Sequence, residues 1–141
     1  MQLTIEPASA MHRDAIAGLW KRTNLTTSYN DPHADFDFAK RGPNSEVLIG
    51  SIDGRVVASV MAGHDGHRGW LYYVAVDPDL QGRKLGAQIV AAGEDWLRSR
   101  GIWKVQLLIR ETNLAVKAFY EHLGYEKSSV IVMSKKVGEG F

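Results

Sequence analysis

The sequence contains no cysteine. Disulfide bonds, thiolate nucleophiles, iron–sulfur clusters and cysteine-ligated zinc sites are therefore excluded. Long hydrophobic runs are also missing, because the longest wholly apolar stretch, residues 70–76, is far shorter than the roughly 20 residues that a helix needs to span a bilayer. Residues 1–6 lack the basic and then apolar pattern of a signal peptide. These absences predict a soluble, cytoplasmic protein without a membrane partner.

The chain has no excess of charge of one sign, since 17 Lys and Arg stand against 16 Asp and Glu and the net charge is +1. Without a strong positive field, a nucleic-acid partner is not expected. The motifs Gly-x-x-x-x-Gly-Lys-Ser/Thr, Gly-x-Gly-x-x-Gly and Gly-x-Ser-x-Gly are all absent. Their absence argues against P-loop nucleotidases, standard dinucleotide-binding folds and α/β-hydrolases. A local site for a small anion remains open.

The length of 141 residues and a hydrophobic content of 45% predict one globular domain over residues 1–141. Strands are expected near residues 3–5, 47–49, 56–61, 70–76, 105–109 and 130–133. Helices are expected near residues 10–22, 35–40, 84–100 and 114–123, capped by Ser9 and Asn113 at two of their starts. Hairpin strands followed by helix–strand–helix–strand predict an α/β fold of the α+β type, with helices on both faces of a mixed sheet.

The first candidate for chemistry is residues 81–87, Gln-Gly-Arg-Lys-Leu-Gly-Ala, which follow an apolar strand and open the longest helix. The start of a helix carries unpaired N–H groups and a partial positive charge, and glycine lets a ligand approach the backbone. Arg83 and Lys84 have the wrong sign for a helix start, at a cost of about 0.3–1 kcal/mol each. A bound diphosphate would reverse that cost. The alternative is a glycine-rich turn with two solvated cations.

The second candidate begins at Asn113, continues through Phe119 and Tyr120 and ends at Gly124 and Tyr125. Tyr120 follows Phe119 directly, so the two rings point in different directions on the predicted helix. A tyrosine there can present its hydroxyl to a cleft. By itself this motif fits a core tyrosine with a satisfied hydroxyl better.

Together, the two motifs resemble those of the GNAT superfamily of acetyl-CoA-dependent N-acetyltransferases. The pyrophosphate motif of that family is Arg/Gln-x-x-Gly-x-Gly/Ala, and residues 81–86 fit it except that Lys84 stands in the place of the first glycine. Residues 74–78 fit the strand before that motif, and the second motif fits the family's later one. Residues 30–32, 65–69 and 72–73 also resemble a small bacterial branch labelled YpeA-like. The resemblance covers about residues 1–136 and implies a GNAT fold with a central, mostly antiparallel, splayed sheet.

The resemblance implies acetyl-CoA as the cofactor. The pantetheine arm would lie against the backbone of residues 74–76, and the pyrophosphate would lie on residues 81–87. The implied contacts are made by Val74, Ala75, Val76, Gln81, Gly82, Arg83, Lys84, Leu85, Gly86, Ala87, Asn113 and Tyr120.

The implied reaction is direct transfer of the acetyl group to a primary amine, of a small molecule or a protein, in a ternary complex. Tyr120 occupies the family's position for the acid that protonates the departing sulfur. A relative that acetylates the N-terminus of a ribosomal protein has a glutamate base where this chain has Leu108. Glu111, Tyr72, a histidine of the 64–67 turn or a water chain are the remaining candidates for the base.

The acceptor would enter beside the polar loop at residues 23–32. Its candidate contacts are Asn24, Tyr29, Asn30 and Asp31. Asp31 suits a cationic amine, although an Asn-Asp-Pro turn explains it equally well. His64 and His67 lack a third ligand, so no metal is expected.

Two other functions stay open at this stage. One is a non-catalytic acyl-CoA-binding or sensing domain, suggested by Leu108 and Lys84, and the other is a nucleotide-binding module. Family habit favours a homodimer that uses a sheet edge or the last strand.

Overall fold

The computed structural model describes residues 1–140. The chain divides into two compact units, Met1–Leu107 and Leu108–Phe141. The first unit holds the sheet and three of the α-helices, and the second holds the fourth α-helix. Each unit is described by itself.

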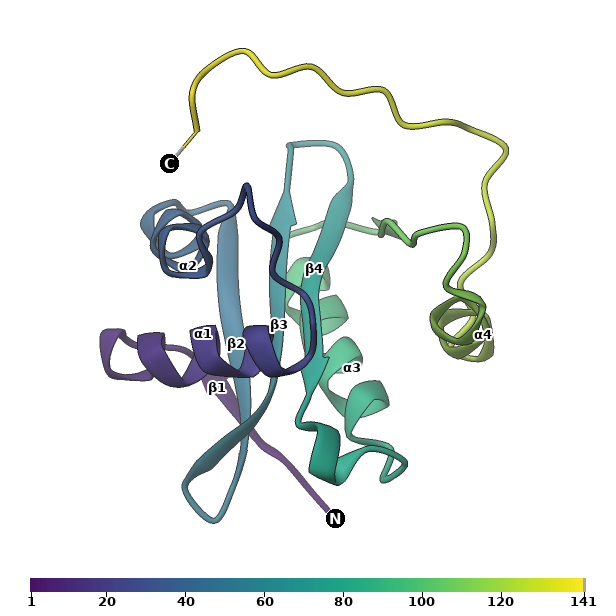
Figure 1. Ribbon diagram of the computed structural model, residues 1–141. Coiled ribbons are helices and arrows are strands. Elements are labelled where there is room, and N and C mark those ends of the chain that lie inside the picture. The colour runs from purple at the N-terminus through teal and green to yellow at the C-terminus, as the bar shows by residue number, and fades with distance from the viewer. Residues whose placement is uncertain (141) are drawn as a thin grey trace. The chain divides into compact units, whose positions relative to one another are not determined.

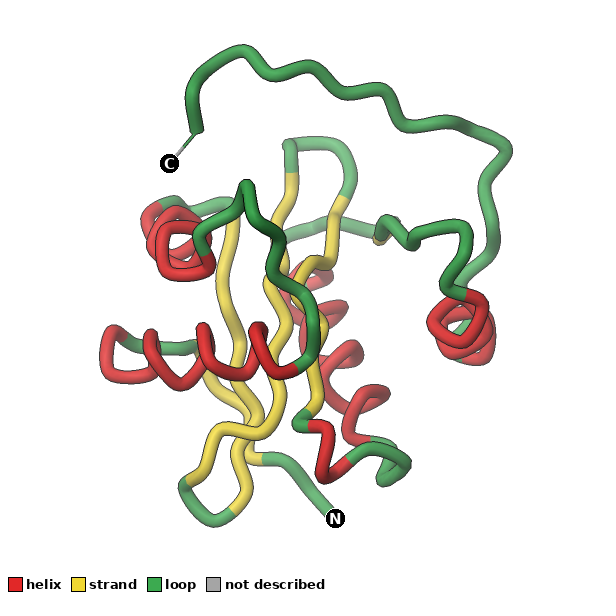
Figure 2. The backbone as a smooth tube through the Cα atoms, viewed as in Figure 1, coloured by secondary structure: helices red, strands yellow, loops and turns green. Residues whose placement is uncertain are grey.

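The first unit is built on one open sheet whose strands follow one another in chain order (Figure 2). The strands are β1 Thr4–Pro7, β2 Ser45–Ile52, β3 Arg55–His64, β4 Gly69–Val76 and β5 Val105–Gln106. The first three pairings are antiparallel and the last is parallel. The prediction of a mixed, mostly antiparallel sheet is therefore confirmed.

The turn between β2 and β3 explains why the predicted hairpin forms. Asp53 and Gly54 both have positive φ, 52° and 78°. A two-residue turn with left-handed backbone at both positions matches the natural twist of antiparallel strands, and Asp-Gly favours it. This turn sets the register in which Ile52 lies opposite Arg55.

Three helices cover the sheet, with α1 (Arg13–Arg22) and α2 (Pro32–Arg41) on one face and α3 (Leu85–Arg98) on the other (Figure 1). A 3₁₀ turn, η1 (Ala10–His12), precedes α1 and takes up the start of the predicted 10–22 helix. The predicted 35–40 helix begins earlier, because the Asp31 side chain accepts hydrogen bonds from the backbone of His33 and Ala34. A proline at the first helical position suits this start.

The core has one apolar layer on each face of the sheet. Under α1 and α2, buried side chains from both helices meet those of β2 and β4, among them Ile16, Trp20, Phe36, Val47 and Ala75. Under α3, the buried side chains are Leu85, Ile89, Val90 and Leu97. Ala92 and Trp96 of the same helix are only partly buried. Gly93 is buried, and there the helix comes close to Val60 and Leu71.

Strand β4 loses its neighbours partway along its length. It pairs with β5 only at Gly69 and Trp70, because β5 ends at Gln106 rather than at Ile109 as predicted. On its other side, the pairs Met61–Tyr72 and Ser59–Ala75 leave an extra residue in β4, which is a β-bulge. The sheet is therefore open beside β4, as the expected splay requires.

The second unit contains α4, Leu114–His122. Its N-cap is Asn113, whose side chain accepts a hydrogen bond from the backbone of Val116, as the sequence predicts. The prediction of a last strand at residues 130–133 is wrong for this structure, which has no strand there. A strand requires a neighbouring backbone, and the four side chains from Val130 to Met133 are instead between 65% and 86% exposed.

Within residues 1–140, no helix is long and apolar enough to cross a membrane.

Candidate active site

The segment between β4 and α3 leaves a row of backbone donors without partners. A 3₁₀ turn, η2 (Pro78–Leu80), leads from β4 into the loop at residues 81–84, and α3 starts at Leu85. Within residues 1–140, none of the backbone N–H groups of residues 82–87 donates a hydrogen bond, and Gln88 is the first to do so. Residues 81–84 are exposed. The loop therefore offers N–H groups and the positive end of a helix to an anion.

Lys84 has left-handed backbone, with φ 62° and ψ 16°. This explains why the family motif has a glycine here, because the left-handed region costs a residue with a Cβ atom roughly 1–2 kcal/mol. Gly82 in the same loop also has positive φ, 81°. Lys84 thus keeps the loop in the glycine conformation at a cost in strain, and adds a cation beside Arg83.

Asp77 anchors the first residues of this loop to the body of the first unit. It is 2% exposed, and its Oδ2 lies 2.6 Å from Nη2 of Arg55 on β3 and 3.3 Å from Nη2 of Arg22 on α1. Its Oδ1 accepts a hydrogen bond from the backbone N–H of Asp79. One carboxylate therefore joins α1, β3 and the start of η2.

The pKa of Asp77 lies below its ordinary value. The hydrogen bond from the Asp79 backbone is the main cause, and the guanidinium groups of Arg55 and Arg22 add to it against the opposing effect of burial. The carboxylate therefore stays ionised at neutral pH.

The bulge in β4 centres on Tyr73, whose φ is 50°. Its backbone carbonyl accepts a hydrogen bond from Ser59, and its ring stacks on Trp20 with the centroids 3.8 Å apart. Its hydroxyl donates to Asp35 over 2.6 Å. Burial, and then the Asp35 carboxylate, raise the pKa of this hydroxyl, which stays protonated.

The bulge changes the face on which Tyr72 lies. In a strand without a bulge, Tyr72 would share a face with Val76, because side chains alternate between the two faces of the sheet. Here Tyr72 lies opposite Met61 and Val76 lies opposite Ala58, and these two β3 residues face opposite sides of the sheet. Tyr72 is 45% exposed, and burial together with the charge of Asp65 raises its pKa. At neutral pH it is a hydrogen-bond donor.

The candidate acceptor residues lie on and after the loop between α1 and α2. Asn24 has left-handed backbone, with φ 59°, and is exposed, as are Tyr29 and Asn30. The Asp31 side chain caps α2. Asp35, one turn into α2, contacts β4 through Tyr73. Helix α2, which follows this loop, and β4 are therefore joined by a side-chain hydrogen bond.

The second unit contains Glu111, Asn113 and Tyr120. Glu111 and Asn113 are exposed, and Asn113 uses its oxygen to cap α4. Tyr120 is buried, with the rings of Phe119 and Tyr125 edge-on to it. Burial raises the pKa of Tyr120 to about 12, so the phenol is protonated at neutral pH.

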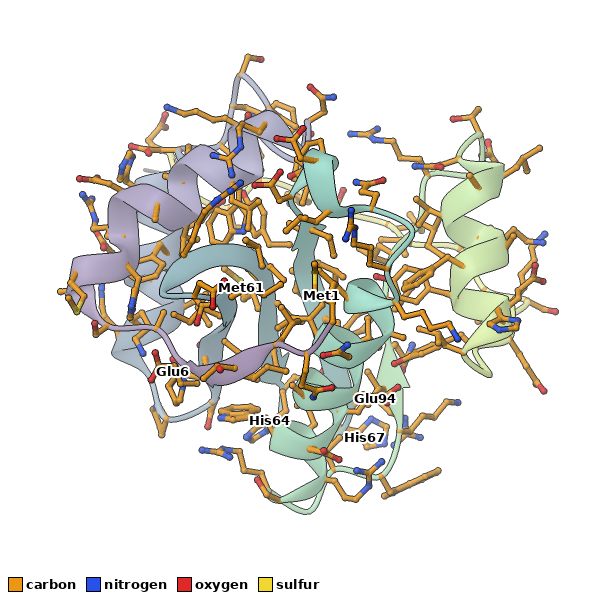
Figure 3. The ribbon with its side chains drawn as sticks, turned by 90° about the horizontal axis from the view of Figure 1, so that it is seen from below. Met1, Glu6, Met61, His64, His67 and Glu94 are labelled. Atoms are coloured by element: carbon orange, nitrogen blue, oxygen red, sulfur yellow. The ribbon has the colours of Figure 1, made fainter. Side chains whose placement is uncertain are left out.

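The histidines between β3 and β4, labelled in Figure 3, form a polar turn. Nδ1 of His64 accepts a hydrogen bond from the backbone of Gly66, and Asp65 accepts from the backbone of His67 and Arg68. In the part of the chain that the structure describes, no group of three His, Cys, Asp or Glu residues is arranged to hold a metal ion.

Sequence reasoning missed the residues that hold the site together, Trp20, Asp35, Ser59, Tyr73 and Asp77. Trp20 was interpreted as ordinary packing, and neither Ser59 nor Asp77 belongs to a motif with a known mechanism. The aspartate before Pro78 is the one readable signal, since Asp-Pro favours a turn that the aspartate caps.

The model of the Acetyltransferase (GNAT) family matches residues 13–125. The acetyltransferase ECA0875 of Pectobacterium atrosepticum is 37% identical over 126 residues, which cover 89% of each chain. The chain belongs to the GNAT acetyltransferase family. It is therefore an enzyme that transfers an acetyl group from acetyl-CoA to an amine. The finer assignment to the YpeA-like branch stays a prediction.

Solved structures of the family share the fold. The aminoglycoside acetyltransferase AAC(6')-Iy, in complex with a bisubstrate analogue, has a TM-score of 0.83 and 18% identity, covering 96% of this chain and 99% of its own. The ribosomal-protein-S18-alanine N-acetyltransferase of Escherichia coli has a TM-score of 0.77 and 23% identity, covering 91% of this chain and 80% of its own. The predicted GNAT fold is thus confirmed.

Replacing Lys84 by glycine is expected to raise the free energy of unfolding by about 0.5–1 kcal/mol, because glycine adopts the left-handed backbone without the Cβ clash. Chemical denaturation measures the change. Lys84→Ala is the matched control, since it removes the charge and keeps the Cβ atom. Equal stability of the glycine and alanine variants would contradict a role for backbone strain.

Replacing Asp77 by asparagine is expected to lower the free energy of unfolding by about 1–2 kcal/mol at neutral pH, because both arginines lose their carboxylate. The lowered pKa of Asp77 means that its contribution is full above the ordinary pKa near 3.9 and is lost as the pH falls through the folded-state value. Urea titrations at neutral pH and below about pH 4 measure both effects. If the difference in the free energy of unfolding between the unaltered protein and Asp77→Asn does not shrink in acid, the charge of Asp77 is unimportant.

Proposed function

We propose that this chain transfers the acetyl group of acetyl-CoA directly to a primary amine, with both substrates bound in one ternary complex. The observation that carries the proposal is the row of undonated N–H groups at residues 82–87, next to Arg83 and Lys84. Those groups fit a diphosphate. The absence of cysteine supports direct transfer, because the chain has no thiol to carry the acetyl group.

The residues fit acetyl-CoA along two stretches of backbone. Gln81, Gly82, Arg83, Lys84, Leu85, Gly86 and Ala87 would hold the pyrophosphate. Val74, Ala75 and Val76 would hold the pantetheine arm on the side of β4 that no strand covers. Asn113 would contact the arm through its amide nitrogen, since its oxygen caps α4. When bound, acetyl-CoA supplies an activated acetyl thioester.

Tyr120 is the proposed acid for the departing sulfur. Its pKa of about 12 keeps the phenol protonated, so it can donate to a thiolate, whose ordinary pKa is near 8.5.

The amine needs a base, since an alkyl amine with an ordinary pKa near 10.4 arrives protonated. Glu111 and Tyr72 are the proposed candidates. The raised pKa of Tyr72 makes it a hydrogen-bond donor at neutral pH, which argues against Tyr72 as the base.

The acceptor is proposed to bind beside Asn24, Tyr29, Asn30 and Asp31. The two solved relatives act, by their names, on an aminoglycoside and on an alanine of ribosomal protein S18. Both acceptors are amines of very different size. A small-molecule amine and a protein amine are therefore both to be tested.

A homodimer is proposed as the assembled form, with the apolar residues 130–133 or a sheet edge at the contact. Exposed apolar side chains in a row favour such a contact. Light scattering is expected to give about twice the 15.6 kDa mass of one chain. Ile131→Lys should reduce that mass to one chain, whereas Met11→Lys, at an exposed site on η1, should not. A single-chain mass for the unaltered protein would contradict the proposal.

A screen of amines with acetyl-CoA tests the function. We expect thiol release with at least one of three acceptor classes: aminocyclitols, polyamines, and peptides with a free N-terminus. The product should carry one acetyl group on nitrogen by mass spectrometry, and intersecting initial-velocity lines should indicate a ternary complex. Binding of acetyl-CoA without turnover across the screen would favour a sensing domain. Tighter binding of ATP than of CoA would favour a nucleotide module.

Tyr120→Phe is expected to lower kcat by at least about tenfold, because the sulfur loses its proton donor. Acetyl-CoA affinity, measured by calorimetry, should stay within about twofold, since one neutral hydrogen bond contributes little to binding. Tyr125→Phe, a second phenol edge-on to Tyr120, is the control and should retain activity. An equally active Tyr120→Phe enzyme would remove the assigned acid.

A further inference from the structure

We propose that Tyr73 is a positioning residue for acetyl-CoA, held by Trp20, Ser59 and Asp35 so that it fixes the bulged backbone of β4. This inference rests on the proposed function of residues 74–76. It assigns a role to four residues that are not among the candidate cofactor, catalytic or acceptor residues.

The backbone at Tyr73 has a conformation that tyrosine does not adopt without support. Its φ of 50° lies in the left-handed region, which disfavours residues with a Cβ atom. Non-glycine residues persist there only when surrounding contacts hold them. The contacts around Tyr73 are therefore the cause to look for.

Three separate contacts hold Tyr73, one to its backbone carbonyl, one to its ring and one to its hydroxyl. The carbonyl accepts a hydrogen bond of 2.9 Å from the Ser59 hydroxyl, which in turn accepts 2.8 Å from Nε1 of Trp20. The ring lies on the Trp20 ring with an angle of 14° between the planes. The hydroxyl donates to Oδ2 of Asp35.

The four residues lie on four different elements, α1, α2, β3 and β4. Trp20 and Ser59 are both fully buried, so their hydrogen bond is shielded from water. Asp35 lies on α2, just after the acceptor loop. The four residues therefore tie the backbone that would hold the pantetheine arm to the helices that border the acceptor.

The bulge matters because it decides where the following peptide groups point. Tyr73 and Val74 have no partner in β3, and β4 beyond Trp70 has no partner in β5. The register is therefore interrupted on the β3 side and no strand pairs on the other side, so a regular ladder does not orient this stretch. The side chain of Tyr73 takes over that task.

The chain offers a sharp test, because the hydrogen bond and the charge at position 35 can be separated. Tyr73→Phe keeps the ring on Trp20 and removes the donor. Asp35→Ala removes the acceptor, whereas Asp35→Asn keeps an oxygen that accepts from Tyr73. Asp37→Asn is the control on the same helix, where it breaks only the exposed pair with Arg13.

We expect Tyr73→Phe and Asp35→Ala each to weaken CoA binding, measured by calorimetry, by about fivefold to tenfold. Asp35→Asn and Asp37→Asn should stay within about twofold, which is the rescue that a hydrogen-bond role requires. In the ligand-free proteins, the amides of residues 74–76 should exchange with solvent about tenfold faster in the two weakened variants. Thermal melts confirm that each variant is folded.

Unchanged CoA affinity in folded Tyr73→Phe and Asp35→Ala would overturn the proposal, even if exchange becomes faster. Weakened binding in Asp35→Asn equal to that in Asp35→Ala would also overturn it, because charge rather than hydrogen bonding would then be responsible. Failure of the unaltered protein to bind CoA would instead refute the proposed function, which keeps the two failures distinct.

Discussion

The first unit depends on the two hydrogen bonds made by the hydroxyl of Ser59. This hydroxyl accepts from the indole of Trp20 and donates to the carbonyl of Tyr73, so a helix, a central strand and a bulged strand meet at one oxygen. Trp20 and Ser59 are both fully buried, where an unmade hydrogen bond costs about 1–3 kcal/mol. The requirement to satisfy these groups holds β4 in its irregular form.

The irregular strand and the loop that follows it are linked through Asp77. The strand ends at Val76, and the next residue is fastened to Arg22 and Arg55 before the chain reaches the cationic loop. In that loop the Gln81 side chain donates to the Val76 carbonyl, but the backbone N–H groups of residues 82–84 donate to no group within residues 1–140. The loop contains two cations, one of them a lysine with left-handed backbone, and a row of unpaired N–H groups. Such a segment is more stable with a bound anion than without one. The fold therefore leaves these N–H groups unpaired in the stretch that we propose holds the pyrophosphate of acetyl-CoA.

Tyr73 and Lys84 both have strained left-handed backbone; Tyr73 directly precedes the proposed pantetheine strand, and Lys84 lies in the proposed pyrophosphate loop. At Tyr73, side-chain contacts offset the strain. At Lys84, glycine would remove it, and the cation is the property that lysine adds. The left-handed backbone is therefore held by side-chain contacts at Tyr73, whereas at Lys84 it remains strained and the side chain contributes a cation.

Local patterns were sufficient for much of this protein. The Asp-Gly turn, the cap at Asn113 and the glycine loop before α3 depend on neighbours in the sequence, so the sequence by itself determined most of the helices and strands, the family and the acetyl donor. The sequence pattern also predicted a strand at residues 130–133, although a strand needs a neighbouring strand to pair with. It gave no sign of the bulge in β4 that changes the face of Tyr72. The bulge, the shared carboxylate of Asp77 and the hydrogen bond from Tyr73 to Asp35 join residues far apart in the chain. Only the tertiary structure decided these, because a buried polar group chooses its partner by proximity in space.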